Sequence, residues 1–172
     1  VRSRPGRGST FAIEVPLVRR TGVAVKPERD TRAAVADAAE LDSLNGLRMF
    51  ILEDNAAILR ATKALLERWG CTVATAASRE EAMRLIASET AMFDLIIADY
   101  HLDDGDNGVD TVASMQEHLD YGVPAIIVTA DISSESLQHA TDHGFPLLQK
   151  PFRPAALRAA ITDSIQNQAE LS

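Results

Sequence analysis

The sequence is short of the features that mark secreted and membrane proteins. It contains a single cysteine, Cys71, among 172 residues, so an internal disulfide bond is excluded. One lone thiol is typical of a reducing compartment, and we expect a cytoplasmic protein. No apolar run approaches the length that a bilayer span requires, so no membrane contact is expected. Residues 1–8 carry three arginines without a following apolar core, unlike a secretion signal.

Positive charge is scarce in the larger part of the chain. Residues 33–172 hold nine Lys or Arg against twenty-two Asp or Glu, a net charge of −13. Residues 1–32 hold eight Lys or Arg against three Asp or Glu, a net charge of +5. This change of sign indicates two units of different origin. Phosphate backbones would repel the acidic unit, so we do not expect it to bind nucleic acid.

From residue 47 onward the sequence contains a regular alternation of short apolar runs and amphipathic segments. The runs are rich in Ile, Val and Leu, and their length suits strands that are buried on both faces of a sheet. Five such strand–helix repeats predict an α/β fold in which helices cover both faces of a parallel sheet. The predicted strands are Leu47–Leu52, Cys71–Ala74, Phe93–Ala98, Pro124–Thr129 and Pro146–Gln149.

Local signals mark the helices between these strands. Ser78 and Glu81 have the spacing of a capping box at the start of the second helix. Pro154 suits the first turn of the last helix. The segment 133–141 has few apolar positions, so we expect this helix to pack weakly.

Charged and hydroxyl side chains stand where the predicted strands end. Glu53 and Asp54 follow the first strand, and Asp99 follows the third. Thr129 ends the fourth strand, and Lys150 follows the fifth. In open parallel sheets, ligands bind beyond the carboxyl ends of the strands. We therefore expect three carboxylates, a hydroxyl and an ammonium to converge on one edge of the sheet.

Three carboxylates in one place repel one another. One pair separated by about 4 Å costs roughly 4 kcal/mol at an effective dielectric constant of about 20. A divalent cation removes this cost, and an all-oxygen ligand set favours Mg²⁺, Mn²⁺ or Ca²⁺ over zinc. A carboxylate beside such a cation and a lysine can attack phosphorus, because both positive groups neutralise charge on the phosphoryl oxygens. The pattern therefore predicts phosphoryl transfer.

The segments FILED, LIIADYHL, AIIVTAD and LLQKPF resemble the receiver domains of two-component response regulators. The resemblance covers residues 46–168 and implies a flavodoxin-like (βα)5 fold. This fold is a doubly wound parallel sheet with strand order 2-1-3-4-5, here preceded by an N-terminal arm. The resemblance also implies a role in phosphorelay signalling, in which the domain accepts a phosphoryl group from phosphohistidine.

The resemblance assigns a role to each residue at the sheet edge. Asp99 is the phosphoryl acceptor, and Thr129 and Lys150 bind the phosphoryl group. The peptide bond between Lys150 and Pro151 is expected to be cis. Mg²⁺ is expected to be held by three carboxylates and one backbone carbonyl, those of Glu53, Asp54, Asp99 and His101.

Two features depart from the family pattern. The position three residues before the lysine often carries Tyr or Phe as a rotameric switch partner, and here it is Leu147. The loop before Gly108 lacks the common proline at Asp103 and is one residue longer. We expect these departures to leave the chemistry intact and to change the surface that partners contact.

The remaining cysteine and histidines receive plain structural interpretations. Cys71 is expected to be a small buried hydrophobic residue. His118, His139 and His143 show no spacing that indicates a metal site, and we expect them to be surface residues.

A second resemblance lies near the start of the chain. The segment GRGSTF, followed by EVP, is similar to the last glycine box and final strand of a histidine-kinase ATP-binding domain. The chain begins with Val1 rather than methionine, and little sequence follows the last predicted helix. We therefore expect the C-terminal part of a hybrid sensor histidine kinase. The predicted domains are a kinase remnant at 1–16, a linker at 17–45 with one helix around 31–41, and the receiver at 46–168.

The implied partner is the dimerisation and phosphotransfer domain of a histidine kinase or a separate histidine phosphotransfer protein. This fragment lacks an ATP site, so we expect it only to accept phosphoryl groups and to dephosphorylate itself. One alternative is a stand-alone or degenerate receiver that acts as a protein-binding module. Another is an aspartyl-nucleophile phosphatase of the haloacid dehalogenase type, which needs a second Asp where this chain has His101.

Overall fold

The computed structural model describes residues 2–4, 8–10, 44–88, 92–119, 121–130 and 133–171. The chain divides into two compact units, residues 1–34 and 35–172. In the first unit, β1 (Arg2–Arg4) pairs antiparallel with β2 (Gly8–Thr10), which contains part of the predicted glycine box. Residues 11–16 and the predicted linker helix lie outside the described residues.

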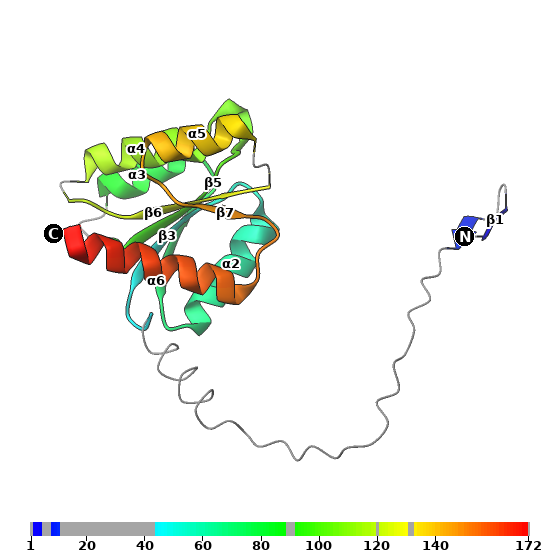
Figure 1. Ribbon diagram of the computed structural model, residues 1–172, viewed down its shortest axis with the longest axis horizontal. Helices are drawn as coiled ribbons and strands as arrows, with labels where there is room; N and C mark the ends of the chain where they lie inside the picture. The colour runs from blue at the N-terminus through cyan, green and yellow to red at the C-terminus, as the bar shows by residue number, and fades with distance from the viewer. Residues whose placement is uncertain are drawn as a thin grey trace, which may run out of the picture. The chain divides into compact units, whose positions relative to one another are not determined.

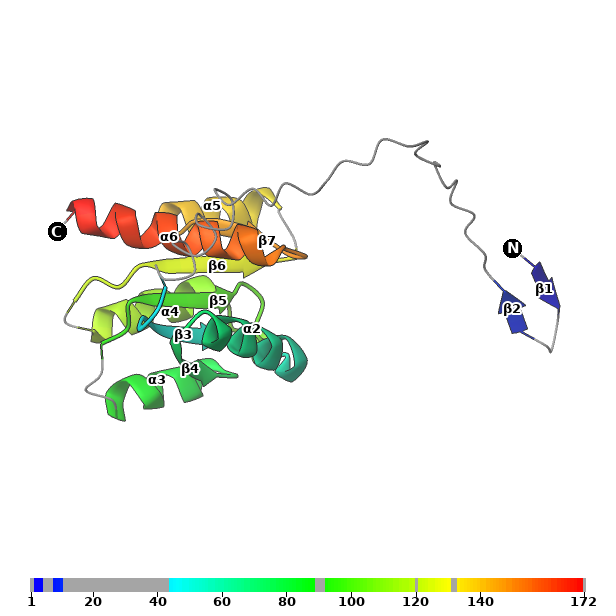
Figure 2. The ribbon, with the colours of Figure 1, turned by 90° about the horizontal axis from the view of Figure 1, so that it is seen from below.

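The second unit is built on a sheet of five parallel strands in the order β4-β3-β5-β6-β7 (Figure 2). Numbered within this unit, the order is 2-1-3-4-5, which confirms the predicted flavodoxin-like fold. The strands are β3 (Arg48–Leu52), β4 (Thr72–Ala76), β5 (Leu95–Asp99), β6 (Ala125–Thr129) and β7 (Leu147–Gln149).

Each of these strands begins one or two residues later than the sequence predicted. Two of the predicted first residues are prolines, which have no N–H to donate to a neighbouring strand. Pro124 and Pro146 instead accept hydrogen bonds through their carbonyl oxygens, from Ile96 N at 3.0 Å and Ile127 N at 2.9 Å.

Five described helices alternate with the strands and form two outer layers (Figure 1). The helices α2 and α6 cover one face of the sheet, and α3, α4 and α5 cover the other. The last helix continues beyond residue 168, where the predicted receiver ended. The bounds are α2 (Ala56–Arg68), α3 (Arg79–Ser88), α4 (Gly108–His118), α5 (Ser134–Asp142) and α6 (Pro154–Leu171), with a short 3-10 helix, η1, at Asp103–Gly105.

Side-chain caps hold the starts of several helices. The Asn55 carboxamide oxygen accepts backbone N–H groups at the start of α2, from Ala57 at 3.0 Å and Ile58 at 3.2 Å. One half of the predicted capping box is present, because the Ser78 hydroxyl accepts from Glu81 N at 3.2 Å, whereas the Glu81 carboxylate accepts from Ala77 N at 2.8 Å rather than from Ser78 N. These caps satisfy backbone donors that a helix cannot pair internally. The cap at Asn55 also fixes the turn that carries Glu53 and Asp54.

The strands bury side chains on both faces, as their apolar runs predicted. In β3, Phe50 and Leu52 pack beneath α3 and α4, whereas Met49 and Ile51 pack beneath α2 and α6. The alternation follows from the two-residue period of a strand. It gives the second unit two apolar clusters that hold the sheet rigid from both sides.

The apolar core extends into the segment that the sequence assigned to the linker. Leu44 is 1% exposed and packs in the cluster beneath α2 and α6. The Cys71 thiol is buried beside it and donates a hydrogen bond to the Leu44 carbonyl oxygen at 3.3 Å. Burial raises the pKa of this thiol, so Cys71 is held in its unreactive protonated form.

We expect Leu44→Ala to lower the free energy of unfolding by about 2–5 kcal/mol, because it leaves a cavity in a packed cluster. Urea unfolding of the full chain measures this change. The matched control is Met92→Ala, which truncates a side chain that is 61% exposed and should change stability by less than about 0.5 kcal/mol. Equal stability of the Leu44 variant and the unsubstituted chain would show that this segment does not belong to the core.

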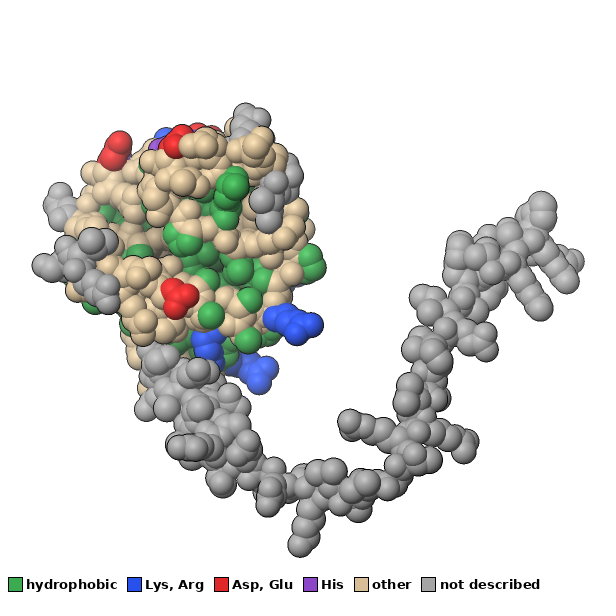
Figure 3. Space-filling model, viewed as in Figure 1, with side chains coloured by type: hydrophobic (Ala, Val, Ile, Leu, Met, Phe, Trp, Pro, Cys, Tyr) green, Lys and Arg blue, Asp and Glu red, His purple; other side chains and the backbone are tan. Residues whose placement is uncertain are grey.

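One face of the second unit presents apolar side chains to solvent. In Figure 3 hydrophobic side chains gather at the centre of the face formed by α5, β7 and α6. Leu137 of α5 is 47% exposed. Within the described part of the chain, no helix combines the length and the apolar character that a membrane span requires.

Candidate functional site

The carboxyl ends of four strands meet at one edge of the sheet. Asp99 is the last residue of β5 and pairs with Val128, next to Thr129, the last residue of β6. Glu53 directly follows β3, and Lys150 directly follows β7. The structure therefore brings the predicted residues together from positions as far as 97 residues apart in the chain.

Lys150 joins the two most enclosed carboxylates of this edge. Its Nζ donates to Glu53 Oε2 and to Asp99 Oδ2, each at 2.7 Å. The side chains of Lys150, Glu53 and Asp99 are 17%, 6% and 12% exposed. Charge-assisted hydrogen bonds of this length, shielded from solvent, fix the orientation of the Asp99 carboxylate.

A third carboxylate completes the cluster. Glu53, Asp54 and Asp99 each offer an oxygen that lies within 4.8 Å of the others. These three carboxylates and the one ammonium of Lys150 leave a net charge of −2 when all are ionised. A hard divalent cation matches both this charge and the all-oxygen ligand set.

Burial and charge shift the pKa values of two groups in this cluster. Burial raises the pKa of Glu53 above its ordinary value of 4.5, and the nearby charge of Asp99 raises it further, against the hydrogen bond from Lys150. Burial alone would lower the pKa of Lys150, but its hydrogen bonds to Asp99 and Glu53 outweigh burial and hold the pKa above 10.5. The Lys150 ammonium therefore stays charged, but its single positive charge does not neutralise both negative charges of Glu53 and Asp99.

The raised pKa of Glu53 means that the folded protein binds this proton more tightly than the unfolded chain does. The stability from this group is present below pH 4.5 and is lost as pH rises through the raised pKa. We expect Glu53→Gln to gain stability relative to the unsubstituted, metal-free chain as pH is raised from 4.5 to neutral. Urea unfolding at several pH values tests this. The control is Glu67→Gln, at a side chain that is 51% exposed, and its stability relative to the unsubstituted chain should not change with pH. The prediction would be contradicted if the relative stabilities of the two variants changed with pH in the same way.

Thr129 is the last residue of β6, and His101 lies two residues beyond the end of β5. Thr129 is fully buried, and its carbonyl oxygen accepts from Lys150 N at 2.7 Å, which ties the end of β6 to the lysine. His101 lies two residues after Asp99 and forms an isolated antiparallel bridge with Asn107, which shapes the loop beside the carboxylates. The Lys150–Pro151 bond is cis, as expected. Leu147 is half-buried and packs against the core beneath α3, α4 and α5.

Gly108 is a positioning residue that the sequence did not single out. It opens α4, and its N–H donates to the Tyr100 carbonyl oxygen at 2.9 Å. A Cβ at Gly108 would overlap the carbonyl oxygen of Asp99 and lie 3.3 Å from Ala98 Cβ. A glycine directly after an Asn that caps a helix was the only signal in the sequence for this close approach.

We expect Gly108→Ala to lower the free energy of unfolding by about 1–3 kcal/mol, because the added methyl group must displace the backbone that carries Asp99. Thermal or urea unfolding measures the loss. Gly122→Ala is the matched control, since a Cβ there would meet only the amide end of the flexible Gln168 side chain, at 2.9 Å. Unchanged stability in Gly108→Ala would show that the backbone at Asp99 can shift to make room for the methyl group without loss of stability.

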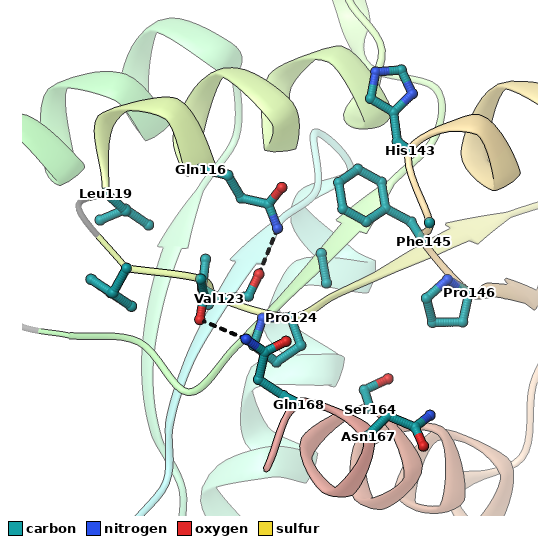
Figure 4. Close-up of a pocket in the computed structure, with 14 residues that line it drawn as sticks. Gln116, Leu119, Val123, Pro124, His143, Phe145, Pro146, Ser164, Asn167 and Gln168 are labelled. Carbon is teal, nitrogen blue, oxygen red and sulfur yellow. Dashed lines mark hydrogen bonds between the residues drawn. The ribbon is translucent and has the colours of Figure 1, made fainter. Parts of the chain in front are cut away.

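Two cavities flank different edges of the sheet. One, of about 480 Å³, lies beside the carboxylate cluster, between α2 and the segment from Lys150 to Pro154, and is lined mainly by apolar side chains. The other, of about 560 Å³, lies at the opposite edge, by the residues that precede β6 and β7 (Figure 4). There the side-chain amides of Gln116 and Gln168 donate to the Val123 and Gly122 carbonyl oxygens at 2.6 and 3.3 Å. None of the predicted site residues lines this second cavity.

Comparisons with known proteins agree with this geometry. Residues 49–162 match the family described as Response regulator receiver domain. The autoinducer 2 sensor kinase/phosphatase LuxQ of Vibrio parahaemolyticus is 27% identical over 164 residues, which are 95% of this chain and 18% of that protein. The phyllosphere-induced regulator PhyR of Methylorubrum extorquens is 34% identical over 127 residues, which are 73% of this chain and 46% of that protein. The chain thus spans less than half the length of these relatives.

The fold also matches solved structures. A CheY-like response regulator receiver domain protein from Methanospirillum hungatei superposes with a TM-score of 0.66 at 29% identity, over 74% of this chain and all of that one. A receiver domain protein from Clostridium thermocellum superposes with a TM-score of 0.65 at 25% identity, over 73% of this chain and 99% of that one.

Proposed function

The chain belongs to the response regulator receiver family of two-component signalling, and we propose that Asp99 accepts a phosphoryl group from phosphohistidine. The observation that supports this role best is the pair of 2.7 Å contacts from Lys150 Nζ to Asp99 and Glu53. They hold one oxygen of the acceptor carboxylate against a fixed positive charge, next to two further carboxylates. Positioning and charge neutralisation are most of what phosphoryl transfer requires.

In the proposed reaction, an Asp99 oxygen attacks the phosphorus of a phosphohistidine. The new O–P bond forms as the P–N bond breaks, and the donor imidazole leaves with its electron pair and takes up a proton. The Lys150 ammonium, already beside Asp99 Oδ2, neutralises charge on the transferring phosphoryl oxygens. The Thr129 hydroxyl donates a hydrogen bond to the phosphoryl group on Asp99.

The residues present fit Mg²⁺ as the cofactor. The carboxylates of Glu53, Asp54 and Asp99 and the His101 carbonyl would hold it, and the net charge of −2 of the three carboxylates with Lys150 supports a divalent cation there. When bound, Mg²⁺ supplies a second positive charge that stabilises the phosphoryl oxygens. Asn55 keeps the Glu53 carboxylate in place, because its backbone N–H donates to Glu53 Oε1 at 3.3 Å.

An apolar surface beside the site suits a helical phosphodonor. Ile58 of α2 is 37% exposed and lines the 480 Å³ cavity together with Leu65, Phe152 and Pro154. Lys150 lines the same cavity, so a protein that covers this surface brings its own side chains close to Asp99. We assign the surface to the dimerisation and phosphotransfer domain of a histidine kinase or to a separate histidine phosphotransfer protein.

The parent that we propose is a hybrid sensor histidine kinase. The alignment with a sensor kinase/phosphatase extends over 95% of this chain, well beyond the receiver, and the GRGSTF segment resembles a kinase glycine box. We retain the proposed organisation of a kinase remnant at 1–16, a linker at 17–45 and a receiver at 46–168. Kinases of this kind draw on ATP, so we place the receiver in the cytoplasm.

The test is incubation of the full chain with acetyl phosphate, a small phosphoryl donor, in the presence and absence of Mg²⁺. Intact mass should show one added phosphoryl group only when Mg²⁺ is present, and peptide mapping should locate it on Asp99. A degenerate receiver would gain no mass and release no phosphate. A phosphatase would release phosphate continuously without a lasting adduct. Either of these two outcomes would overturn the proposal.

A further inference from the structure

The face between α4 and α5 brings together three metal-binding side chains that the proposed phosphoryl transfer does not use. Asp110 lies in the first turn of α4, and His139 and His143 lie one helical turn apart at the end of α5. Each residue offers one ligand atom that lies within 4.8 Å of the others. The sequence predicted only that His139 and His143 are surface residues, and it gave no role to Asp110, which lies 29 positions before His139.

We propose that Asp110, His139 and His143 bind a borderline divalent transition-metal ion, with Zn²⁺ as the representative. Imidazole nitrogens favour Zn²⁺, Cu²⁺ and Ni²⁺, whereas Mg²⁺ and Ca²⁺ prefer oxygen ligands. Two histidines and one carboxylate form a three-ligand set of the kind that leaves a fourth position of Zn²⁺ for water. This chemistry separates the site from the all-oxygen cluster at Glu53, Asp54 and Asp99.

The distance between two of the proposed ligand atoms matches the separation of two zinc ligands. His139 Nε2 lies 3.2 Å from Asp110 Oδ1. Two ligands at zinc distances of about 2.0–2.1 Å and tetrahedral angles lie roughly 3.3 Å apart. The same 3.2 Å also suits a direct hydrogen bond from His139 to Asp110. In the zinc-bound state the neutral His139 ring would carry its proton on Nδ1, which faces the Tyr100 hydroxyl, and Nε2 would offer its lone pair to the metal in place of that hydrogen bond.

Each of the three ligands has a further polar contact that orients it. The Tyr100 hydroxyl lies 3.4 Å from His139 Nδ1, and Asn107 Nδ2 donates to Asp110 Oδ2. The His143 ring has its Nδ1 3.0 Å from the His139 carbonyl oxygen, and Nε2 is therefore the proposed metal ligand. Outer contacts from hydroxyls, amides and carbonyls to the second polar atom of a ligand are typical of protein metal sites.

Packing also holds the His143 ring, and solvent can reach the cluster. The ring stacks on Phe145 with centroids 5.9 Å apart and planes inclined by 19°, and both residues line the cavity of about 560 Å³ (Figure 4). The side chains of Asp110 and His139 are 51% and 29% exposed, so an ion can enter without unfolding the core. Bound metal would tie α5, which packs with few buried apolar side chains, to the start of α4.

The experiment is calorimetric titration of the tag-free full chain with Zn²⁺, together with the visible absorption spectrum of the Co²⁺ form. We expect one Zn²⁺ per chain, and an affinity at least about 10-fold weaker in His139→Gln and in His143→Gln. The matched control is His118→Gln, because His118 also makes a 3.0 Å contact to a carbonyl one turn back but lies outside the cluster. Its affinity and Co²⁺ spectrum should be unchanged.

A variant of the proposed Mg²⁺ site tests whether Zn²⁺ binds at Asp110, His139 and His143 rather than at the carboxylate cluster. In Glu53→Gln, Zn²⁺ binding should persist with unchanged affinity, whatever that variant does to phosphorylation. Tyr100→Phe, which removes an outer contact and no ligand, should weaken Zn²⁺ by about 10-fold. Zinc affinity that is lost in Glu53→Gln, or that survives in both His139→Gln and His143→Gln, would overturn the proposal. Circular dichroism of each variant confirms that its fold is intact.

Discussion

Asp99→Asn is expected to abolish phosphorylation by acetyl phosphate and by a phosphohistidine donor, with a fall in rate of at least about 10³-fold. Asp99 is the carboxylate that stands at the end of β5, and its Oδ2 lies 2.7 Å from the Lys150 ammonium. A carboxamide of the same shape keeps the packing but is a far weaker nucleophile. Intact mass after incubation with Mg²⁺ and each donor measures the effect.

The controls for this substitution are an exposed aspartate and the fold itself. Asp163→Asn, at an exposed position of α6, should leave both the rate and the amount of phosphorylation unchanged. Circular dichroism should show that Asp99→Asn is folded. Full phosphorylation of Asp99→Asn would show that another residue is the phosphoryl acceptor, and the neighbouring Asp54 would be the first residue to test.

Lys150→Met has the second largest expected effect, because it acts on both chemistry and stability. Removing a positive charge that faces the transferring group should slow phosphorylation by about 10²–10³-fold. In the metal-free chain, the substitution leaves two largely buried carboxylates, 6% and 12% exposed, without their shared counterion. Breaking a buried ion pair in this way costs about 3–5 kcal/mol of stability near neutral pH.

The two effects of Lys150→Met can be separated by experiment. Saturating Mg²⁺ should restore part of the lost stability, because it supplies positive charge to Glu53 and Asp99, but it should not restore the phosphorylation rate. Lys63→Met is the matched control, since the Lys63 side chain is 41% exposed and its Nζ lies 3.9 Å from Glu67 Oε1. It should change stability by less than about 1 kcal/mol. Equal stability of Lys150→Met and Lys63→Met would show that the Lys150 ion pairs contribute little.

The sequence determined the secondary-structure alternation and the identity of the residues at the sheet edge. Strand and helix periods are local properties, and the residue that ends a strand, such as Asp99 or Thr129, follows from the run before it. A parallel sheet then places all those ends on one edge, so the cluster could be predicted without coordinates. The strand order, by contrast, entered through the family resemblance and was confirmed by the observed pairing.

The tertiary structure decided what depends on distance and burial across the chain. The pKa of Glu53 rises because packing excludes water from it and places Asp99 beside it, and neither effect has a signature in the local sequence. The importance of Gly108 arises from the approach of α4 to the backbone of Asp99, and Leu44 belongs to the core because it packs beneath α2 and α6. These are contacts between segments that no periodic pattern connects.

The cluster on α4 and α5 shows the same division most clearly. The four-residue spacing of His139 and His143 is visible in the sequence, but two histidines supply only two of the three protein ligands that the proposed zinc site needs. Asp110 joins them only because α4 and α5 cover the same face of the sheet, which follows from the strand order β5-β6-β7. The sequence determined which ligands the chain carries, and the packing of helices on the sheet decided which of them meet.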